Sequence, residues 1–309
     1  MDSSPISDIA SMPASENAET VRIIIAGGGT GGHIFPALAI ANAIKNLNPK
    51  ADILFVGAKG KMEMEKIPEA GYNIEGIDIA GYNRSSLIKN IALPYKLLQS
   101  YFQVRKILKS FKPDAVVGVG GYSSFPVLKL AQARNIPTFI HEANSLAGRS
   151  NMMLGKNATK IFVAGAGMEK YFPAAKIMIT GNPVRKVFLN SVPKDEAIKF
   201  FGLQSGKKTV FVMGGSLGAR SINETIESNA DAFAKNNLQL IWQTGKDFAP
   251  RAAKIEEERS NMWSNAFISK MENAYAAADV VIARAGAMTI AELCVVKKAA
   301  IFVPFPFAA

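Results

Sequence analysis

The residues best suited to chemistry follow a glycine cluster near the amino terminus. Gly27-Gly-Gly-Thr-Gly-Gly32 is followed directly by His33. Glycines let backbone N–H groups approach a phosphate or a sugar closely, and the N-terminus of a following helix favours negative charge. His33 suits general-base catalysis because the ordinary pKa of histidine, about 6.5, lies near neutral pH. The alternatives are a tight structural turn and a helix-start histidine bonded to backbone.

The spacing Gly27-x-Gly29-x-x-Gly32 also matches the dinucleotide-binding fingerprint. An NAD site requires in addition an acidic residue at the end of the second strand, where it holds the ribose. That strand candidate ends in Val56-Gly57-Ala58-Lys59 and carries no carboxylate. The sequence therefore disfavours a nicotinamide cofactor.

Two further loops of this kind follow strand-like segments in the second half of the chain. In residues 214–220, Ser216 and the loop N–H groups could bind a pyrophosphate. Arg220 is either an additional charge or a solvated helix residue. In residues 283–292, Glu292 could hold a ribose diol, and the alternative is an ordinary favourable charge near a helix N-terminus.

The loops after two other strand candidates, residues 118–126 and 141–148, place polar groups at the same sheet edge as His33. His141 is explained equally well as a packed loop histidine and as a catalytic one.

The segments that position these loops alternate between strand-like and helix-like, which is typical of a doubly wound α/β fold. The opening of strand, glycine loop and helix occurs twice, after Ala26 and after Met213. Predicted strands are 21–26, 53–57, 74–79, 115–118, 138–140, 160–163, 177–180, 208–213, 238–243, 280–283 and 300–303. Predicted helices include 37–44, 63–70, 97–111 and 221–228.

We therefore predict two Rossmann-like domains, residues 21–181 and 182–309, which meet at Gly181-Asn-Pro-Val-Arg185 because Asn-Pro marks a turn. Residues 1–20 are acidic, contain no basic residue and are predicted to be a disordered lead-in rather than a signal peptide.

Composition excludes several protein classes. With 309 residues, of which 49% are hydrophobic and 20% charged, the chain can bury two cores and is not disordered overall. The single cysteine, Cys294, excludes a disulfide scaffold. With only His33 and His141 as further soft ligands, a structural zinc site is disfavoured. No apolar run reaches the roughly 18–20 residues that cross a bilayer, so the cytoplasm is the default compartment.

Six motifs occur in order along the chain, at residues 28–37, 118–122, 141–148, 181–185, 214–220 and 284–293. Together they closely resemble the MurG family of bacterial N-acetylglucosaminyltransferases, over about residues 21–309. The resemblance implies a GT-B fold, in which two Rossmann-like domains face each other across a cleft. It also implies transfer of GlcNAc, with inversion, from UDP-GlcNAc to the MurNAc 4-hydroxyl of undecaprenyl-pyrophosphoryl-MurNAc-pentapeptide, which converts lipid I to lipid II in peptidoglycan synthesis.

The same resemblance assigns site residues. His33 and Tyr122 would lie on the acceptor side, and Ile268 would meet uracil through its backbone. The candidate for the catalytic base is His33, and the alternative is a residue of the stretch that follows position 309 in the family. The full set of implied donor contacts is Thr30, Gly31, Gly32, Asn144, Arg185, Ser216, Ile268, Ala287, Met288, Thr289, Ile290, Ala291 and Glu292. Helix N-termini and Arg185 can stabilise the departing UDP, and no Asp-x-Asp metal signature is present, so no metal or other cofactor is expected.

The family acts at the cytoplasmic face of the inner membrane, and the basic balance of the chain suits that place. The net charge is +11, and no acidic residue lies between Asp78 and Asp114. We expect residues 84–96 to touch an anionic bilayer, with each cation contributing about 1 kcal/mol to the free energy of membrane binding. The alternative is that the apolar residues pack on the sheet, and we prefer this alternative for residues 97–111. The expected membrane contacts are Arg84, Leu87, Ile88, Lys89, Ile91, Leu93 and Lys96. A basic chain can also bind nucleic acid, but no nucleic-acid recognition motif is present to support this. Cell-wall synthesis proteins are further candidate partners.

The chain departs from the family in three places. Relatives usually carry glutamine where this chain has Ala143 and Leu217, and we expect neither change to abolish chemistry. The chain ends at Ala309, before an acidic–His/Gln stretch and a last helix that the family has, so we expect it to be truncated there. The alternatives are another UDP-sugar enzyme of GT-B fold, such as a glycolipid synthase or a UDP-GlcNAc epimerase, and a truncated, non-catalytic, membrane-associated UDP-binding protein.

Overall fold

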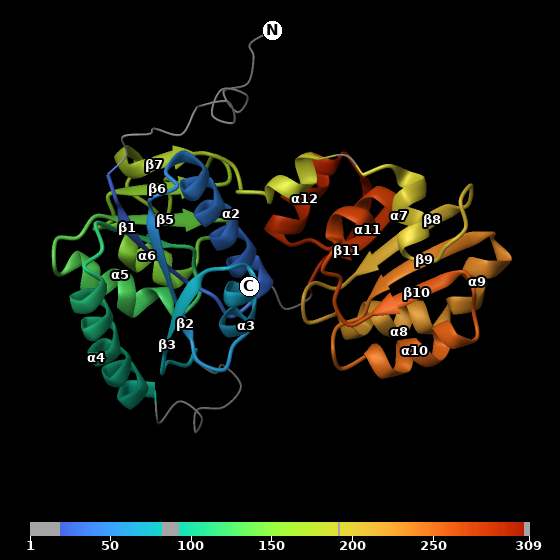
Figure 1. The fold of residues 1–309 in the computed structure, drawn as a ribbon, viewed down its shortest axis with the longest axis horizontal. Coiled ribbons are helices and arrows are strands. Elements are labelled where there is room, and N and C mark those ends of the chain that lie inside the picture. Colours follow the sequence, from blue (N-terminus) through green and yellow to red (C-terminus); the bar gives the residue numbers. More distant parts are fainter. Residues whose placement is uncertain (1–18, 82–92, 191, 306–309) are drawn as a thin grey trace, which may run out of the picture. The chain divides into compact units, whose positions relative to one another are not determined.

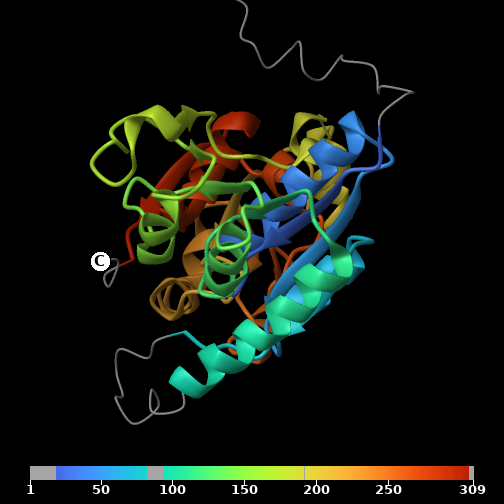
Figure 2. The same ribbon diagram turned by 90° about the vertical axis from the view of Figure 1, so that its left-hand side faces the viewer.

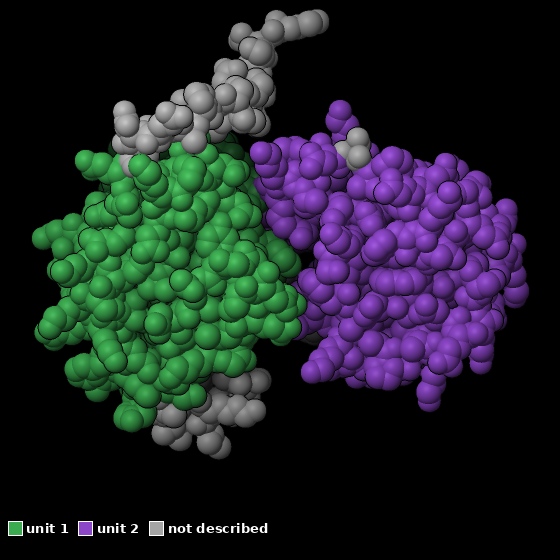
Figure 3. Space-filling model, in the orientation of Figure 1, with its two compact units in different colours: residues 1–183 green, residues 184–309 purple. Residues whose placement is uncertain are grey.

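The computed structural model describes residues 19–81, 93–190 and 192–305. The chain divides into two compact units, residues 1–183 and residues 184–309 (Figure 3). The sequence-predicted boundary lies between residues 181 and 182, and most of the predicted lead-in, residues 1–20, lies outside the described residues.

The first unit is built on a parallel seven-stranded sheet with the order β3-β2-β1-β4-β5-β6-β7 (Figure 1). Its strands are β1 (Arg22–Ala26), β2 (Asp52–Ala58), β3 (Asn73–Ile77), β4 (Ala115–Gly118), β5 (Thr138–Glu142), β6 (Lys160–Val163) and β7 (Ile177–Ile179). Its helices are α2 (Gly31–Leu47), α3 (Glu63–Glu69), α4 (Leu93–Phe111), α5 (Ser124–Gln132) and α6 (Arg149–Gly155), with a short 3-10 turn, η2 (Ala174–Lys176).

The strand order reverses between β1 and β4, and ligands of doubly wound sheets bind at such switch points. Ile24 of β1 pairs with Leu54 on one side and with Val116 on the other. Consecutive residues of β1 point to opposite faces, so Ile24 joins one buried apolar cluster and Ile25 another. The sheet is therefore covered on both faces, which explains the continuous β-branched run of β1.

The second unit repeats this plan with a parallel five-stranded sheet in the order β10-β9-β8-β11-β12. Its strands are β8 (Lys208–Met213), β9 (Leu238–Gln243), β10 (Met262–Asn265), β11 (Val280–Arg284) and β12 (Ala299–Val303). Its helices are η3 (Lys186–Leu189), α7 (Lys194–Phe200), α8 (Arg220–Ser228), α9 (Ala230–Lys235), α10 (Ala249–Glu257), α11 (Met271–Ala277) and α12 (Ala287–Val296). Phe211 and Val212 of β8 are both fully buried, on opposite faces.

The predicted doubly wound α/β pattern is confirmed, and every predicted strand is present within two residues of its expected limits. Sequence reasoning missed β10, because its Met-Trp-Ser-Asn run is too short to show a period. It also began the first helix at Ala37, whereas α2 begins at Gly31 and contains Pro36.

Helix α4 lies on one flank of its unit (Figure 2). The burial of its side chains differs along its length. Val104, Ile107 and Leu108 are buried against the sheet, whereas Leu98 is 58% exposed and Phe102 64% exposed. The prediction that the apolar residues of 97–111 pack on the sheet is therefore confirmed at Val104, Ile107 and Leu108 and wrong at Leu98 and Phe102, which are exposed.

The predicted membrane contacts fall mostly beyond what the structure covers. Arg84, Leu87, Ile88, Lys89 and Ile91 lie outside the described residues, as does the side chain of Leu93, while Lys96 is exposed. Within the described ranges, no helix has the length and apolar character that a bilayer span requires.

Candidate functional site

The first glycine loop lies at the switch point of the seven-stranded sheet, between β1 and α2. Gly28 has a φ of +151°, and a Cβ there would overlap the carboxyl group of Glu63. On the other side, a Cβ at Gly121 would lie 2.6 Å from the Gly28 carbonyl oxygen. Only glycine fits between these neighbours, so the loop is fixed by close backbone packing on both sides.

Helix α2 presents a free positive end at this loop. Thr30 is its N-cap, and the Thr30 carbonyl accepts hydrogen bonds from the N–H groups of His33 (3.0 Å) and Ile34 (3.1 Å). The N–H groups of Gly31 and Gly32 precede these and have no acceptor within the helix. No acidic residue occupies the first turn, so the positive end of the helix dipole is left for an external anion.

His33 lies in the first turn of α2, partly exposed, with its Nδ1 3.0 Å from the Gly28 carbonyl oxygen. A carbonyl only accepts, so Nδ1 carries the proton and Nε2 keeps its lone pair. Burial lowers the pKa of His33, while the Gly28 carbonyl and the charges of Glu142 and Glu63 act in the opposite direction. His33 is therefore neutral at neutral pH and can accept a proton at Nε2.

Tyr122 follows β4 in a turn, and its ring lies beside the glycine loop. A methyl group at Gly29 would lie 3.8 Å from the ring, and one at Gly81 would lie 3.0 Å away. Burial raises the pKa of Tyr122, and the charge of Glu63 adds to this, so its hydroxyl stays protonated. Tyr122 thus lies on the same sheet edge as His33 and can donate a hydrogen bond.

His141 lies inside strand β5 rather than in a loop. It is 3% exposed, and burial lowers its pKa to about 4, so it is neutral under ordinary conditions. Neither ring nitrogen has a hydrogen bond of normal geometry, and Asn182 is the neighbouring polar side chain. The interpretation of His141 as a packed, structural histidine fits this buried position better than a catalytic role at the sheet edge.

Asn144 is held by a buried carboxylate that sequence reasoning did not single out. Glu142 is 3% exposed, and its Oε1 accepts from the backbone N–H (3.1 Å) and the Nδ2 (3.2 Å) of Asn144. Its Oε2 accepts from the Gly148 N–H (3.0 Å) and from Asn151 Nδ2 (2.9 Å). Glu142 therefore organises the loop after β5 and orients the exposed side chain of Asn144.

The second glycine loop follows β8 and packs against the end of β9. Gly218 has a φ of +79°, and a Cβ there would overlap the Thr244 carbonyl oxygen. Ser216 lies partly exposed at the tip of this loop. Helix α8 follows with no acidic residue in its first turn, and Arg220 is exposed and paired with Glu224 (2.7 Å). Arg220 is thus a solvated helix residue here.

Gln243 joins this loop to the segment that contains Ile268. Its Nε2 donates to the Gly215 carbonyl (3.0 Å), and its Oε1 accepts from the Ile268 N–H (2.9 Å). The side chain of Ile268 is buried, so only its backbone can meet a ligand. Sequence reasoning missed Gln243. The available signal was a polar residue at the end of a buried strand, directly before Thr244-Gly245, which indicates a side chain that bonds the loops at the sheet edge.

The third loop leads into α12, whose N-cap is Gly286 and whose first turn has no acidic residue. The first turn of α12 therefore has the same positive helix-dipole end as that of α2, which favours a nearby anion. Ile290 is 40% exposed and Ala291 is partly buried.

Glu292 lies in the second turn of α12 and is largely buried. Its Oε2 accepts a hydrogen bond from the Tyr275 hydroxyl (2.9 Å), and its Oε1 lies 3.6 Å from the Arg185 guanidinium. Burial raises the pKa of Glu292, while Arg185 and Tyr275 favour its charged form. Arg185 in turn stacks over the Phe188 ring at 4.5 Å. The two sequence-predicted residues Glu292 and Arg185 are thus brought together, with Tyr275 as a third member that sequence reasoning missed.

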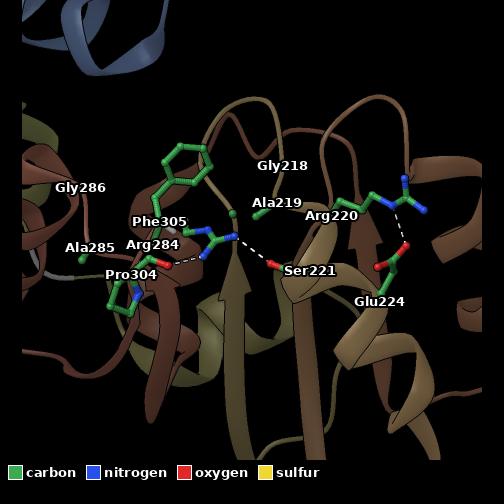
Figure 4. Close-up of a pocket in the computed structure, with 11 residues that line it drawn as sticks. Gly218, Ala219, Arg220, Ser221, Glu224, Arg284, Ala285, Gly286, Pro304 and Phe305 are labelled. Atoms are coloured by element: carbon green, nitrogen blue, oxygen red, sulfur yellow. Dashed lines mark hydrogen bonds and ion pairs between the residues drawn. The ribbon is translucent and has the colours of Figure 1, made fainter. Parts of the chain in front are cut away.

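A pocket of about 680 Å³ opens at the same edge of the five-stranded sheet (Figure 4). At its centre Arg284 donates to the Pro304 carbonyl (2.7 Å) and to Ser221 Oγ (2.8 Å), and lies under the Phe305 ring. The residues lining it are Gly214, Gly218, Ala219, Arg220, Ser221, Glu224, Arg284, Ala285, Gly286, Pro304 and Phe305. Arg284 was not predicted; it joins the segment after β12 to the first turn of α8.

Each unit thus gathers its own predicted residues at the carboxyl edge of its own sheet. Thr30, Gly31, Gly32, His33, Tyr122 and Asn144 belong to the first unit, and Arg185, Ser216, Ile268 and residues 287–292 belong to the second. In the described part of the chain, no three His, Cys, Asp or Glu side chains are grouped so as to hold a metal ion.

Comparison with known families matches both units. Residues 23–163 match the glycosyltransferase family 28 N-terminal domain, and residues 209–309 match the glycosyltransferase family 28 C-terminal domain. The UDP-N-acetylglucosamine--N-acetylmuramyl-(pentapeptide) pyrophosphoryl-undecaprenol N-acetylglucosamine transferase of Phocaeicola vulgatus is 51% identical over 292 residues, which is 93% of this chain and 78% of that protein. The transferase of the same name from Parabacteroides distasonis is 50% identical over 92% of this chain and 78% of its own length.

Solved structures agree with these matches. The crystal structure of Acinetobacter baumannii MurG superposes with a TM-score of 0.66 at 29% identity and covers 94% of this chain and 80% of that one. The UDP-GlcNAc 2-epimerase from Neisseria meningitidis gives a TM-score of 0.59 at 14% identity, over 92% of this chain and 82% of that one, which shows a shared fold alone. The predicted GT-B fold is confirmed.

Proposed function

Because the chain belongs to the MurG family of glycosyltransferases, within family 28, we propose that it transfers GlcNAc from UDP-GlcNAc to the MurNAc 4-hydroxyl of lipid I and so forms lipid II for peptidoglycan. The observation that carries this proposal is His33, a neutral histidine whose Nε2 lone pair is available next to a helix end that favours anions. These are the base and the anion site that an inverting transfer from a UDP-sugar requires.

The proposed reaction is a single displacement. Nε2 of His33 takes the proton of the acceptor hydroxyl, whose oxygen forms a bond to C1 of GlcNAc as the bond from C1 to the diphosphate oxygen breaks. The electron pair leaves with UDP, and the configuration at C1 inverts. The N–H groups at the start of α12 and the charge of Arg185 lower the energy of the departing diphosphate.

Donor recognition is proposed to rest on the second unit. Glu292, already held by Tyr275 and Arg185, would accept hydrogen bonds from the ribose hydroxyls. Because Gln243 takes the N–H of Ile268, the Ile268 carbonyl is the backbone group that would accept from the uracil N3–H. Ser216 and the first-turn N–H groups of α12 would then bind the diphosphate.

Replacement of the base tests this mechanism. We expect His33→Ala to lower kcat by roughly 100-fold or more, the usual contribution of a general base, while the KM for UDP-GlcNAc changes little. Steady-state kinetics with a soluble lipid I analogue measure both constants. Equal losses in kcat and in donor affinity would remove His33 from the role of base.

Membrane attachment is proposed to be peripheral, at the cytoplasmic face, through α4 and the residues before it. Tyr95 is 70% exposed and, with Leu98 and Phe102, forms an apolar strip beside the exposed Lys96. An apolar strip next to cations suits an anionic bilayer. A Leu98→Ser/Phe102→Ser variant should sediment less with anionic vesicles, while Leu47→Ser, at an exposed position on α2, should not change. Unchanged binding of the double variant would refute the proposed surface.

A further inference from the structure

Glu63 is a buried carboxylate that the proposed mechanism does not use. It is the first residue of α3 and is 1% exposed. Its Oε2 accepts from the Gly29 N–H (2.8 Å), and its Oε1 accepts from the Ala58 N–H (3.0 Å). An NAD site would have a carboxylate at the end of β2 to bind the ribose, and none is present there. Glu63 follows β2 by five residues and instead binds the backbone of the glycine loop.

The Gly28–Gly29 peptide connects Glu63 to His33. Its N–H donates to Glu63, and its carbonyl accepts from Nδ1 of His33 at 3.0 Å. In a trans peptide the N–H and the C=O point in opposite directions, so one peptide plane lies between the two side chains. The orientation of this plane decides whether His33 meets an acceptor or a donor.

We propose that Glu63 is a positioning residue that locks the Gly28–Gly29 peptide, so that His33 keeps its proton on Nδ1 and its lone pair on Nε2. This inference rests on the proposed function of His33 as the base. A neutral imidazole carries one ring proton, and the group that faces Nδ1 decides where the proton lies. Glu63 thus acts on catalysis through the backbone without contacting substrate.

Both residues of this peptide are glycines, with φ values of +151° and +92°, and no Cβ opposes a rotation of the plane. A rotated peptide would present the Gly29 N–H to His33. Nδ1 would then have to accept, the ring proton would move to Nε2, and the base would be lost. A charged carboxylate that only accepts hydrogen bonds holds the N–H in the productive direction.

Glu63 is itself held firmly. A Cβ at Gly57 would lie 2.5 Å from its Cγ, and a Cβ at Gly28 would overlap its carboxyl group, so the side chain lies between two glycine backbones. The charges of Glu63 and Glu142 face His33 and favour its protonation, whereas the neighbouring His141 is neutral at neutral pH. Loss of the Glu63 charge would therefore lower the pKa of His33 further and move the acidic limb of the rate profile to lower pH.

The tautomer of His33 can be measured directly, because the chain has only two histidines. Long-range ¹H–¹⁵N spectra of the ¹⁵N-histidine-labelled chain, assigned with His33→Gln, distinguish the two tautomers without any need for activity. We expect a proton on Nδ1 of His33 in the native chain and a proton on Nε2, or a mixture, in Glu63→Gln, since the amide presents a donor to one of the two N–H groups. The matched control is Glu65→Gln, an exposed glutamate on the same helix.

In kinetics, Glu63→Gln should lower kcat by roughly 10- to 100-fold, which does not exceed the lower end of the roughly 100- to 10,000-fold that a general base contributes. The donor KM should stay within about twofold, and Glu65→Gln should leave both constants unchanged. A native His33 with its proton on Nε2 would overturn the proposal, as would a Glu63→Gln variant with native tautomer and kcat. If the native chain shows the expected tautomer but transfers no sugar, the proposed function fails, while the structural role of Glu63 stands.

Discussion

Two buried glutamines on strand β9 test where the donor site lies. Gln239 and Gln243 are four positions apart on one strand and are 0% and 3% exposed. Gln243, at the carboxyl end, joins the glycine loop to Ile268, whereas Gln239, near the start, bonds Gln204 and Thr209 at the opposite edge of the sheet. We expect Gln243→Leu and Gln239→Leu to have similar effects on stability and different effects on donor binding.

The expected magnitudes follow from these bonds. Gln243→Leu leaves the buried Ile268 N–H without its acceptor, which costs about 1–3 kcal/mol, and removes the bond to Gly215, worth about 1 kcal/mol because that exposed carbonyl regains water. Gln239→Leu removes a similar set of bonds, partly to the exposed Gln204, so each variant should lose about 2–4 kcal/mol of unfolding free energy.

Only Gln243→Leu should weaken UDP binding, because it releases both the pyrophosphate loop and the backbone of Ile268. A loss of about 1.4 kcal/mol or more corresponds to a tenfold or greater rise in Kd. Urea denaturation measures the stability of both variants, and titration calorimetry with UDP measures Kd. Equal affinities in the two variants, or a greater loss in Gln239→Leu, would refute the placement of the donor at the carboxyl edge of the second sheet.

Two further predictions concern single charges. Glu292→Gln should raise the donor KM by roughly tenfold, since hydrogen bonds to charged groups contribute about 1.5–3 kcal/mol, while kcat changes less; an unchanged KM would show that Glu292 does not hold the ribose. Burial opposes the charge of Asp279, but bonds from Lys194 (2.7 Å), the Thr209 N–H (2.9 Å) and Lys208 (2.9 Å) lower its pKa to about 2. Because this is below the unfolded value of about 3.9, the charged group stabilises the fold above pH 4 and less as pH falls toward 2. Asp279→Asn should therefore cost about 2 kcal/mol at pH 7 and progressively less in urea titrations at lower pH; a cost independent of pH would contradict this.

The fold was accessible from sequence because its elements carry strong local signals. The strand before Gly27 and the strand before Gly214 are buried on both faces, so each appears as a continuous apolar run that ends in a glycine loop. Short elements with few apolar residues, such as β10, show no such signal.

The site was accessible where function depends on backbone. Thr30–Gly32 and Ala287–Thr289 lie at helix starts that glycines mark in the sequence. The side chains that support them were not predicted, because each acts over a contact that no local spacing reveals. Glu63 reaches Gly29 across 34 positions, Gln243 reaches Ile268 across 25, and Tyr275 reaches Glu292 across 17.

Sugar transfer itself tests the central claim most directly. The 309-residue chain would be incubated with radiolabelled UDP-GlcNAc and a short-chain lipid I analogue, beside the Phocaeicola vulgatus relative as positive control and a reaction without acceptor. The proposed function predicts UDP release and label β-linked to the MurNAc 4-hydroxyl, only when the acceptor is present. Conversion of UDP-GlcNAc to its 2-epimer without acceptor, or no labelled acceptor while the relative is active, would contradict it.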